Sequence, residues 1–387
     1  MRNISAALTL VKAHYEKYVY PDFPRLASVR GCDTYALNLE ALWARFNGER
    51  LDPHEGRILL AGCGSFSPYP TAVANWKTPI TALDLSAANL DRARQHTWLR
   101  LHFNVDFIGG DLTRATEQFG EQAFHFIDCY GVIHHIPDDL AALRTLHALL
   151  KPGAFARIMV YSRCARRSIQ AVRRALRLLE IQNVREIRTL CRKARPGSRF
   201  RECVDAAPEA AFDSGLADLF LHPYAKTYLL MELLAKLDQA NLEPLGFIHP
   251  SALPDLDTEI ARLRNLEIAR TLTTNFILFA GRKEDAPRRW AWKSFKAEQE
   301  TWISLNPVIK KFLPFLPLIP MKLAPRLGFA NPPIDLSGKR LLARFKTPVA
   351  KSAIEPGHLK TVEKYLHALF LIETASEPIA WNASIPL

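Results

Sequence analysis

Two glycines and an acidic residue end short apolar runs, and their spacing is typical of a nucleotide-type binding site. Residues 57–64 form an apolar run that ends in Gly62 and Gly64, and residues 80–83 form a second run that ends in Asp84. A buried parallel strand has such a short continuous apolar sequence. The glycines allow a tight turn and close approach of a ligand. The acidic residue can accept hydrogen bonds from ribose hydroxyls.

Further polar residues follow the next apolar runs. Asp111 follows residues 105–110 and suits the exocyclic amine of an adenine, while Tyr130 and Gly131 would line the floor where the reacting group lies. Ser67 occupies the position where a dinucleotide fingerprint has its third glycine, which argues against that motif. No Gly-Lys-Ser/Thr sequence follows, so the pattern is not a P-loop either.

This ordered set resembles the class I S-adenosylmethionine-dependent methyltransferases. Gly62 and Gly64 match the family's glycine motif, Asp84 its ribose acid and Asp111 its adenine-side acid. Residues 128–135 match the segment after the fourth strand, and residues 151–153 match the turn before the fifth. The resemblance implies S-adenosylmethionine as the cofactor. It would be contacted by Ala61, Gly62, Cys63, Gly64, Asp84, Leu85, Asp111, Leu112, Tyr130 and Gly131. The alternative is another doubly wound nucleotide-binding domain.

Further segments resemble one bacterial branch of that superfamily, whose members stand alone or are fused to tetratricopeptide repeats. These segments are residues 14–21, 61–70, 161–167, 221–224 and 228–234. The branch does not define an acceptor. The third small residue of the superfamily's glycine loop is replaced by bulky Phe66, followed by Pro68 and Pro70. This change is expected to stiffen the loop and to narrow the methionine end of the pocket.

The alternation of apolar runs with helical patterns predicts an α/β fold with a doubly wound, Rossmann-like sheet. Strands are expected near residues 57–61, 80–84, 105–109, 124–129 and 154–160, then 244–248 and 273–280. The resemblance implies that the last two complete a seven-stranded sheet with an antiparallel hairpin. The predicted organisation begins with a helical N-terminal cap at residues 1–50 and a methyltransferase domain at 51–282. A basic helical insert lies within that domain at 162–225, and a C-terminal extension of unknown role follows at 283–387.

Composition indicates a globular, cytoplasmic protein. The chain has 387 residues, of which 48% are hydrophobic and 23% charged. The apolar stretch 4–11 is followed at once by charged residues without a cleavage site, so an amphipathic helix is more consistent than a signal peptide. The run 312–321 contains three prolines and is too short to span a bilayer. The six cysteines lack Cys-x-x-Cys spacing, which argues for reduced thiols and against a metal site.

Most of the net charge of +12 lies in one segment. Residues 163–201 contain thirteen arginines and lysines against two glutamates, a balance of +11. Apolar residues at helical spacing predict that this segment packs one helical face and exposes a basic one; they are Ile169, Val172, Leu176 and Leu179. The basic face suits an anionic acceptor such as RNA, a phosphorylated metabolite or an anionic membrane surface, or it is simply a solvated helix face. We expect it at the acceptor entrance rather than at the cofactor site.

Two histidines are the candidates for a catalytic base. His134 and His135 follow the fourth predicted strand, and a histidine with a pKa near neutral can remove a proton from an acceptor hydroxyl or amine. The alternative is that they pack or shape the cofactor floor. Asp128 lies within the strand and is expected to fix the loop by backbone hydrogen bonds. The candidates for substrate contact are Tyr15, Tyr20, His222 and Tyr224.

Three functions remain open from these patterns. The leading hypothesis is methyl transfer to a small or medium-sized acceptor, because the aromatic cap and the insert would enclose a pocket. The second is RNA methylation through the basic segment at residues 163–201. The third is a cofactor-binding interaction protein without catalysis, in which the tail from residue 283 provides the interaction surface. Residues 331–334 resemble the Asn-Pro-Pro-Tyr motif of adenine methylases but lack its aromatic residue, and we interpret them as a turn.

Overall fold

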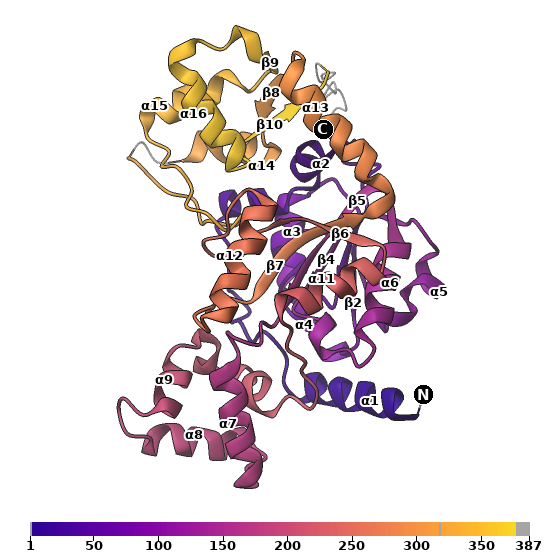
Figure 1. The fold of residues 1–387 in the computed structure, drawn as a ribbon, viewed down its shortest axis with the longest axis vertical. Coiled ribbons are helices and arrows are strands. Elements are labelled where there is room, and N and C mark those ends of the chain that lie inside the picture. Colours follow the sequence, from indigo (N-terminus) through magenta and orange to yellow (C-terminus); the bar gives the residue numbers. More distant parts are fainter. Residues whose placement is uncertain (1, 317–318, 377–387) are drawn as a thin grey trace.

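A mostly parallel seven-stranded sheet forms the centre of the protein (Figure 1). The structure is a computed structural model that describes residues 2–316 and 319–376. The strands lie in the order β3-β2-β1-β4-β5-β7-β6. Their bounds are β1 Ile58–Ala61, β2 Ile80–Asp84, β3 Val105–Gly109, β4 Phe124–Tyr130, β5 Leu150–Val160, β6 Leu242–Phe247 and β7 Phe276–Arg282. Strand β7 runs antiparallel to both β5 and β6. The predicted fold class is confirmed.

The strand order reverses between β1 and β4, and this reversal creates the crevice in which the site lies. Strand β1 pairs in parallel with β2 on one side and with β4 on the other. Loops that leave the carboxyl ends of neighbouring strands in opposite directions open a crevice at this point. All four residues of β1 are buried, as expected for a strand covered on both faces. The glycine turn after β1 therefore lies directly at the switch point.

Helices connect most of the strands. Their bounds are α3 Pro68–Ala74, α4 Ala87–Trp98, α5 Ala115–Phe119, α6 Asp139–Leu149, α11 Leu230–Gln239 and α12 Leu256–Ile268. Ser86 caps α4, because its hydroxyl oxygen accepts from the N–H of Asn89 at 3.2 Å. Asp138 caps α6 in the same way through the N–H of Ala141 at 2.9 Å. These caps fix where each helix begins relative to the end of the preceding strand.

The N-terminal segment lies across the open edge of the crevice and then enters the core. It comprises helix α1 Arg2–Lys17, the 3₁₀ turn η1 Gly31–Leu37 and helix α2 Leu39–Asn47. The carboxylate of Glu16 accepts from the N–H of Ala87 at 2.7 Å, which joins the end of α1 to the first turn of α4. Tyr35 and Leu42 are fully buried, so η1 and α2 belong to the main hydrophobic core.

The segment between β5 and α11 forms a small helical unit with its own core (Figure 1). Its elements are α7 Arg167–Leu178, α8 Val184–Lys193, α9 Arg199–Asp205, η4 Pro208–Ala211, α10 Asp213–Leu216 and the π-helical turn η5 Ala217–Leu221. Leu176, Ile187 and Leu216 are among its buried residues. Leu179, expected on the packed face, is 64% exposed, because α7 ends at Leu178 and the helical periodicity no longer applies.

The C-terminal extension forms a small α/β unit against the N-terminal part of the core (Figure 1). After helix α13 Ala286–Glu298, a three-stranded sheet in the order β10-β8-β9 is packed with helices. The elements are β8 Trp302–Leu305, α14 Pro307–Phe312, η7 Leu313–Phe315, α15 Leu336–Arg344, β9 Val349–Ala350, η8 Lys351–Ala353, α16 Pro356–His367 and β10 Leu371–Thr374. The amide of Asn306 donates to the carbonyl of Tyr35 at 3.1 Å. This contact joins the extension to η1.

Two details of the extension differ from a simple sequence reading. A helical pattern extends to residue 372, but α16 ends at His367, because Leu369 has a φ of 60° and the chain turns into β10. Asn331 does not merely start a turn. Its buried amide donates to the Tyr35 hydroxyl at 2.9 Å and to the carbonyl of Leu323 at 3.2 Å, so it fixes the loop onto the core. None of the helices in the described part of the chain is long and apolar enough to cross a membrane.

Candidate functional site

A cavity of about 1250 Å³ lies at the carboxyl ends of the parallel strands. The loops after β1, β2, β3 and β4 line it, and so do the N-terminal segment, the insert and the loop at residues 325–330 of the extension. Ordinary small-molecule sites occupy about 300–1,000 Å³. The cavity therefore has room for a nucleotide-type cofactor together with a second molecule.

The glycine turn is shaped by contacts within the protein. Gly62 has a φ of 74° and Gly64 a φ of 56°, which favours glycine at both positions. A Cβ on Gly62 would lie 2.4 Å from a methyl of Val132, and one on Gly64 would lie 2.9 Å from the carbonyl oxygen of Tyr20. The glycines therefore admit the β4 loop and the N-terminal segment as well as a ligand. The N–H of Ser65 donates to the same Tyr20 carbonyl at 3.0 Å, which holds the cap on the turn.

Asp84 lies at the end of β2 and is 7% exposed, facing the cavity. Its Oδ2 accepts from the N–H of Gly64 at 2.8 Å. Its Oδ1 accepts from the N–H of Ser86 at 2.9 Å and from the amide of Asn89 at 3.4 Å. Burial raises the pKa of this carboxyl, while these hydrogen bonds act in the opposite direction. A carboxylate has about four acceptor positions, and three are used within the protein, so one remains for a ligand hydroxyl.

The adenine end of the expected site lies beside β3. Asp111 and Leu112 line the cavity, and the carboxylate of Asp111 also accepts from the N–H of Thr113 at 2.9 Å. A second hollow of about 430 Å³ adjoins Asp111 and includes Leu85 and Lys12. Because Lys12 belongs to α1, the N-terminal helix extends over this end of the site as well.

The floor at the end of β4 includes an unpredicted ion pair between buried Asp128 and half-buried Arg157, which also lines the cavity. Tyr130 is 43% exposed, and both it and Gly131 line the cavity. Beneath the ring, Arg157 of β5 donates two hydrogen bonds to Asp128, at 2.8 and 2.6 Å, and its guanidinium lies 5.1 Å from the centre of the Tyr130 ring. Asp128 therefore pairs with a side chain instead of fixing the loop through backbone hydrogen bonds. Ala61 is fully buried and does not line the cavity.

The two candidate bases have different environments. His135 lines the cavity, and its Nδ1 lies 2.9 Å from the carbonyl oxygen of Tyr224. A carbonyl only accepts, so Nδ1 carries the proton and Nε2 keeps a free lone pair. Burial lowers the pKa of His135, so the ring is neutral near pH 7. His134 is fully buried, stacks on Tyr161 with ring centres 3.6 Å apart and does not line the cavity. It cannot reach an acceptor there.

The proposed substrate residues separate into two groups. Tyr15 and Tyr20 line the cavity. His222 is 2% exposed and Tyr224 provides the carbonyl that orients His135, and neither residue lines the cavity. The ring of His222 lies 3.8 Å from that of His135, so His222 and Tyr224 support the histidine instead of contacting a ligand.

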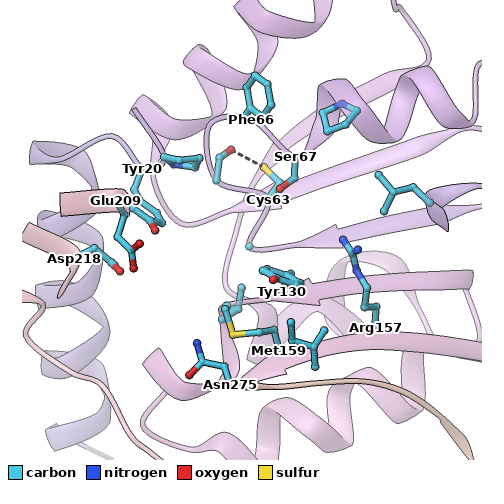
Figure 2. A pocket seen from close by; sticks show the side chains of 18 of the residues that line it. Tyr20, Cys63, Phe66, Ser67, Tyr130, Arg157, Met159, Glu209, Asp218 and Asn275 are labelled. Atoms are coloured by element: carbon cyan, nitrogen blue, oxygen red, sulfur yellow. Dashed lines mark hydrogen bonds between the residues drawn. The ribbon is translucent and has the colours of Figure 1, made fainter. Parts of the chain in front are cut away.

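Three cavity residues from the insert region are not among the predicted site residues. Asp218, in the π-helical turn, accepts from the hydroxyl of Tyr15 at 3.0 Å and from that of Tyr161 at 3.3 Å. Glu209 and Arg166 line the same part of the cavity. Figure 2 shows Glu209 and Asp218 beside Tyr20, on the side of the pocket away from Arg157. An aspartate within the apolar run 215–221 was the available sequence signal, because an acidic side chain is rarely buried without a partner.

A cluster of side chains beside this part of the cavity has the composition of a metal site. His14, Asp218 and His222 each offer a donor atom, and these atoms lie within 4.8 Å of one another. However, Nδ1 of His222 accepts from the N–H of Tyr224 at 3.1 Å, so the proton of the neutral ring is on Nε2. Histidine ligands normally donate their second N–H to an acceptor, which is the opposite arrangement. We therefore assign no metal to this cluster.

Comparisons with known proteins place this domain in a family. Residues 59–158 match the methyltransferase domain model. An uncharacterized protein of Synechococcus sp. is 28% identical over 61% of this chain and 59% of its own length. The ubiquinone biosynthesis O-methyltransferase of Xanthomonas axonopodis pv. citri is 33% identical over 27% of this chain and 42% of its own length. The chain thus spans about half the length of these curated relatives.

Among solved structures, PKMT2 from Rickettsia typhi has a similar fold, with a TM-score of 0.55 and 13% identity over 90% of this chain and 77% of that one. A second structure of that protein, in complex with AdoHcy, gives a TM-score of 0.52. The family match covers the strands that carry the glycine turn, Asp84, Asp111 and Tyr130. The chain therefore contains a class I S-adenosylmethionine-dependent methyltransferase domain, a class that takes S-adenosylmethionine as its cofactor.

Proposed function

We propose that the protein transfers a methyl group from S-adenosylmethionine to a small or medium-sized acceptor. The observation that carries this proposal is a single cavity that joins the glycine turn, Asp84, Asp111 and Tyr130 with a neutral, oriented histidine, His135. These are the parts that binding and transfer require.

The residues present fit the cofactor. Asp84 has one acceptor position left for a ribose hydroxyl, and Asp111, which lines the same cavity, offers a carboxylate that could accept from an adenine amine. Gly62 and Gly64 keep the turn free of side chains at the closest approach. When bound, the sulfonium supplies an already activated methyl group, so the protein mainly provides proximity and alignment.

His135 is the residue proposed to take a proton from the acceptor. Its Nδ1–H is held by the Tyr224 carbonyl, which directs the basic Nε2 away from that carbonyl. The lowered pKa keeps the ring unprotonated and ready to accept a proton at neutral pH. His134, which the sequence offered equally, is proposed only to pack beneath Tyr161.

Enclosure favours a small acceptor over a nucleic acid. The cap, the insert and the extension all contribute residues to the lining of the cavity. The exposed arginines and lysine of the insert that do not line this cavity are Arg163, Arg167, Arg174, Arg177, Arg185, Arg192, Lys193, Arg195 and Arg199. An anionic surface or RNA bound there would have to deliver its reacting group past the cap.

Incubation of the protein with methyl-labelled S-adenosylmethionine and an extract of cells lacking its gene tests the proposal. We expect label to move to an acceptor of low molecular mass, and this transfer to be lost in Asp84→Ala. Asp106→Ala is the matched control, because Asp106 is an exposed aspartate at the neighbouring strand. Absence of label in any acceptor would leave a cofactor-binding protein without catalysis, and label in RNA would contradict the small-acceptor assignment.

A further inference from the structure

The part of the cavity between the cap and the insert contains charged groups of both signs, two of which, Arg166 and Glu209, make no hydrogen bond or ion pair with a described side chain. Arg166, Glu209 and Asp218 line it together with Tyr20 and Tyr161. Figure 2 shows Glu209 and Asp218 beside Tyr20. Arg166 and Glu209 are half-buried, and charged groups withdrawn from water are normally paired with an opposite charge. This part of the cavity therefore has the chemistry of a site for a ligand that carries both charges.

Arg166 is held in a fixed orientation without using its hydrogen-bond donors. Its guanidinium lies 3.6 Å from the centre of the Tyr161 ring, which places the planar group over the aromatic face. In the described part of the chain its side chain makes no hydrogen bond or ion pair. Stacking leaves the N–H groups at the edge of the guanidinium free, in the fork geometry that matches a carboxylate.

Glu209 is the corresponding free anion. Both oxygens of Asp218 already accept hydrogen bonds from Tyr15 and Tyr161, whereas the carboxylate of Glu209 makes no hydrogen bond or ion pair with any described residue. Arg166 and Glu209 also form no ion pair with each other, although both act electrostatically on Tyr20 and Tyr161. The cavity thus holds a cation, Arg166, and an anion, Glu209, that are not paired with each other.

This part of the cavity is continuous with the glycine turn. The backbone of Tyr20 packs on Gly64, since a Cβ there would be 2.9 Å from its carbonyl oxygen, and the ring of Tyr20 lies beside Glu209 (Figure 2). A cofactor whose adenine lies near Asp111 and whose ribose lies near Asp84 extends past this turn. Its far end is an α-amino acid, which carries one carboxylate and one ammonium on the same carbon.

We propose that Arg166 binds the carboxylate and Glu209 binds the ammonium of the methionyl head group of the cofactor. This inference rests on the proposed function. It differs from the expectation that the basic segment contributes only to the acceptor entrance, because Arg166, near the start of that segment, lines the cavity, unlike its neighbour Arg167.

Calorimetric titration with ligands that lack one charged group tests the proposal. The probes are S-adenosylhomocysteine, methylthioadenosine, which lacks the whole head group, and two analogues of S-adenosylhomocysteine that lack only the carboxylate or only the ammonium. In Arg166→Gln we expect S-adenosylhomocysteine to bind about 10- to 100-fold more weakly, the range for a hydrogen bond to a charged group. Methylthioadenosine and the analogue without the carboxylate should bind as they do to the wild type.

Glu209→Gln gives the complementary half of the test. It should weaken S-adenosylhomocysteine by a similar factor and leave the analogue without the ammonium unaffected. Arg167→Gln and Glu202→Gln are matched controls, because both residues are exposed on the insert and neither lines the cavity. Thermal melting of each variant verifies the fold.

The outcomes separate this inference from the function it rests on. If the wild-type protein binds neither S-adenosylhomocysteine nor methylthioadenosine, the proposed function fails. If the wild type binds both but Arg166→Gln and Glu209→Gln leave S-adenosylhomocysteine affinity unchanged, only the head-group site is wrong. An equal loss for all four ligands would also overturn it, since the effect would then not depend on the head group.

Discussion

Replacement of Asp84 by asparagine should weaken the folded protein as well as cofactor binding. The carboxylate receives hydrogen bonds from the backbone N–H groups of Gly64 and Ser86 on opposite oxygens, at 2.8 and 2.9 Å. An asparagine has one oxygen and one NH₂ group. In either orientation of the amide, one of these two N–H groups therefore faces another donor.

The magnitude follows from that count. A buried donor left without an acceptor costs about 1–3 kcal/mol, and the surviving bond loses its charge assistance, worth about 1 kcal/mol. We expect Asp84→Asn to lose about 2–4 kcal/mol of stability without ligand. The variant should also bind S-adenosylhomocysteine about 10-fold or more weakly, because the remaining acceptor position loses its charge.

Thermal melting in the absence and presence of S-adenosylhomocysteine measures both effects, with Asp106→Asn as the control for an exposed aspartate. The ligand-free melting temperature of Asp84→Asn should fall well below that of the control. An unchanged ligand-free melting temperature would refute the hydrogen-bond count. An unchanged ligand-induced shift would refute the ribose assignment.

Other substitutions follow from single contacts. Gly64→Ala should push the Tyr20 carbonyl away, so the N-terminal segment should become more sensitive to trypsin and S-adenosylhomocysteine should bind about 10-fold more weakly; unchanged proteolysis would argue that the cap does not rest on the turn. His135→Gln should lower turnover by about 10²- to 10⁴-fold with cofactor affinity retained, and normal turnover would exclude His135 as the base. Burial lowers the pKa of His14 to about 4, so the unfolded chain takes up a proton at this residue before the folded protein does. The free energy of unfolding should therefore be unaffected above pH 6.5 and fall by about 3 kcal/mol as the pH drops from 6.5 to 4. His14→Gln should flatten this acid side of a curve of unfolding free energy against pH. Glutamine at Arg174, Arg177, Arg185 and Arg192 together removes exposed charge from the insert. If the acceptor is anionic, this variant should lower turnover at low salt only, and a loss of turnover that persists in high salt would argue against long-range attraction.

Local sequence patterns were sufficient for the sheet and for the cofactor side of the site. The continuous apolar runs predicted the central strands, because buried parallel strands must be apolar throughout. The exception is the start of β5, which begins at Leu150 and includes residues 151–153, predicted as a turn. The residues that end those runs, such as Asp84 and Tyr130, then lie at one edge of the sheet for topological reasons.

Contacts between distant segments were beyond the reach of those patterns. The bond between Tyr15 and Asp218 spans 203 positions, and no periodicity in either segment indicates the other. The contact of Tyr20 with Gly64 explains a glycine that also fits a ligand-binding motif, so the motif alone could not reveal it. Likewise His134 and His135 are adjacent in sequence, and only the packing of Tyr161 and the carbonyl of Tyr224 distinguishes their roles.

The central claim is that this cavity binds the cofactor of a methyltransferase. Calorimetric titration of the ligand-free protein with S-adenosylhomocysteine tests it most directly. The account predicts saturable binding of one ligand per chain, weakened in Asp84→Asn and unaffected in Asp106→Asn. No saturable binding at millimolar ligand would contradict it.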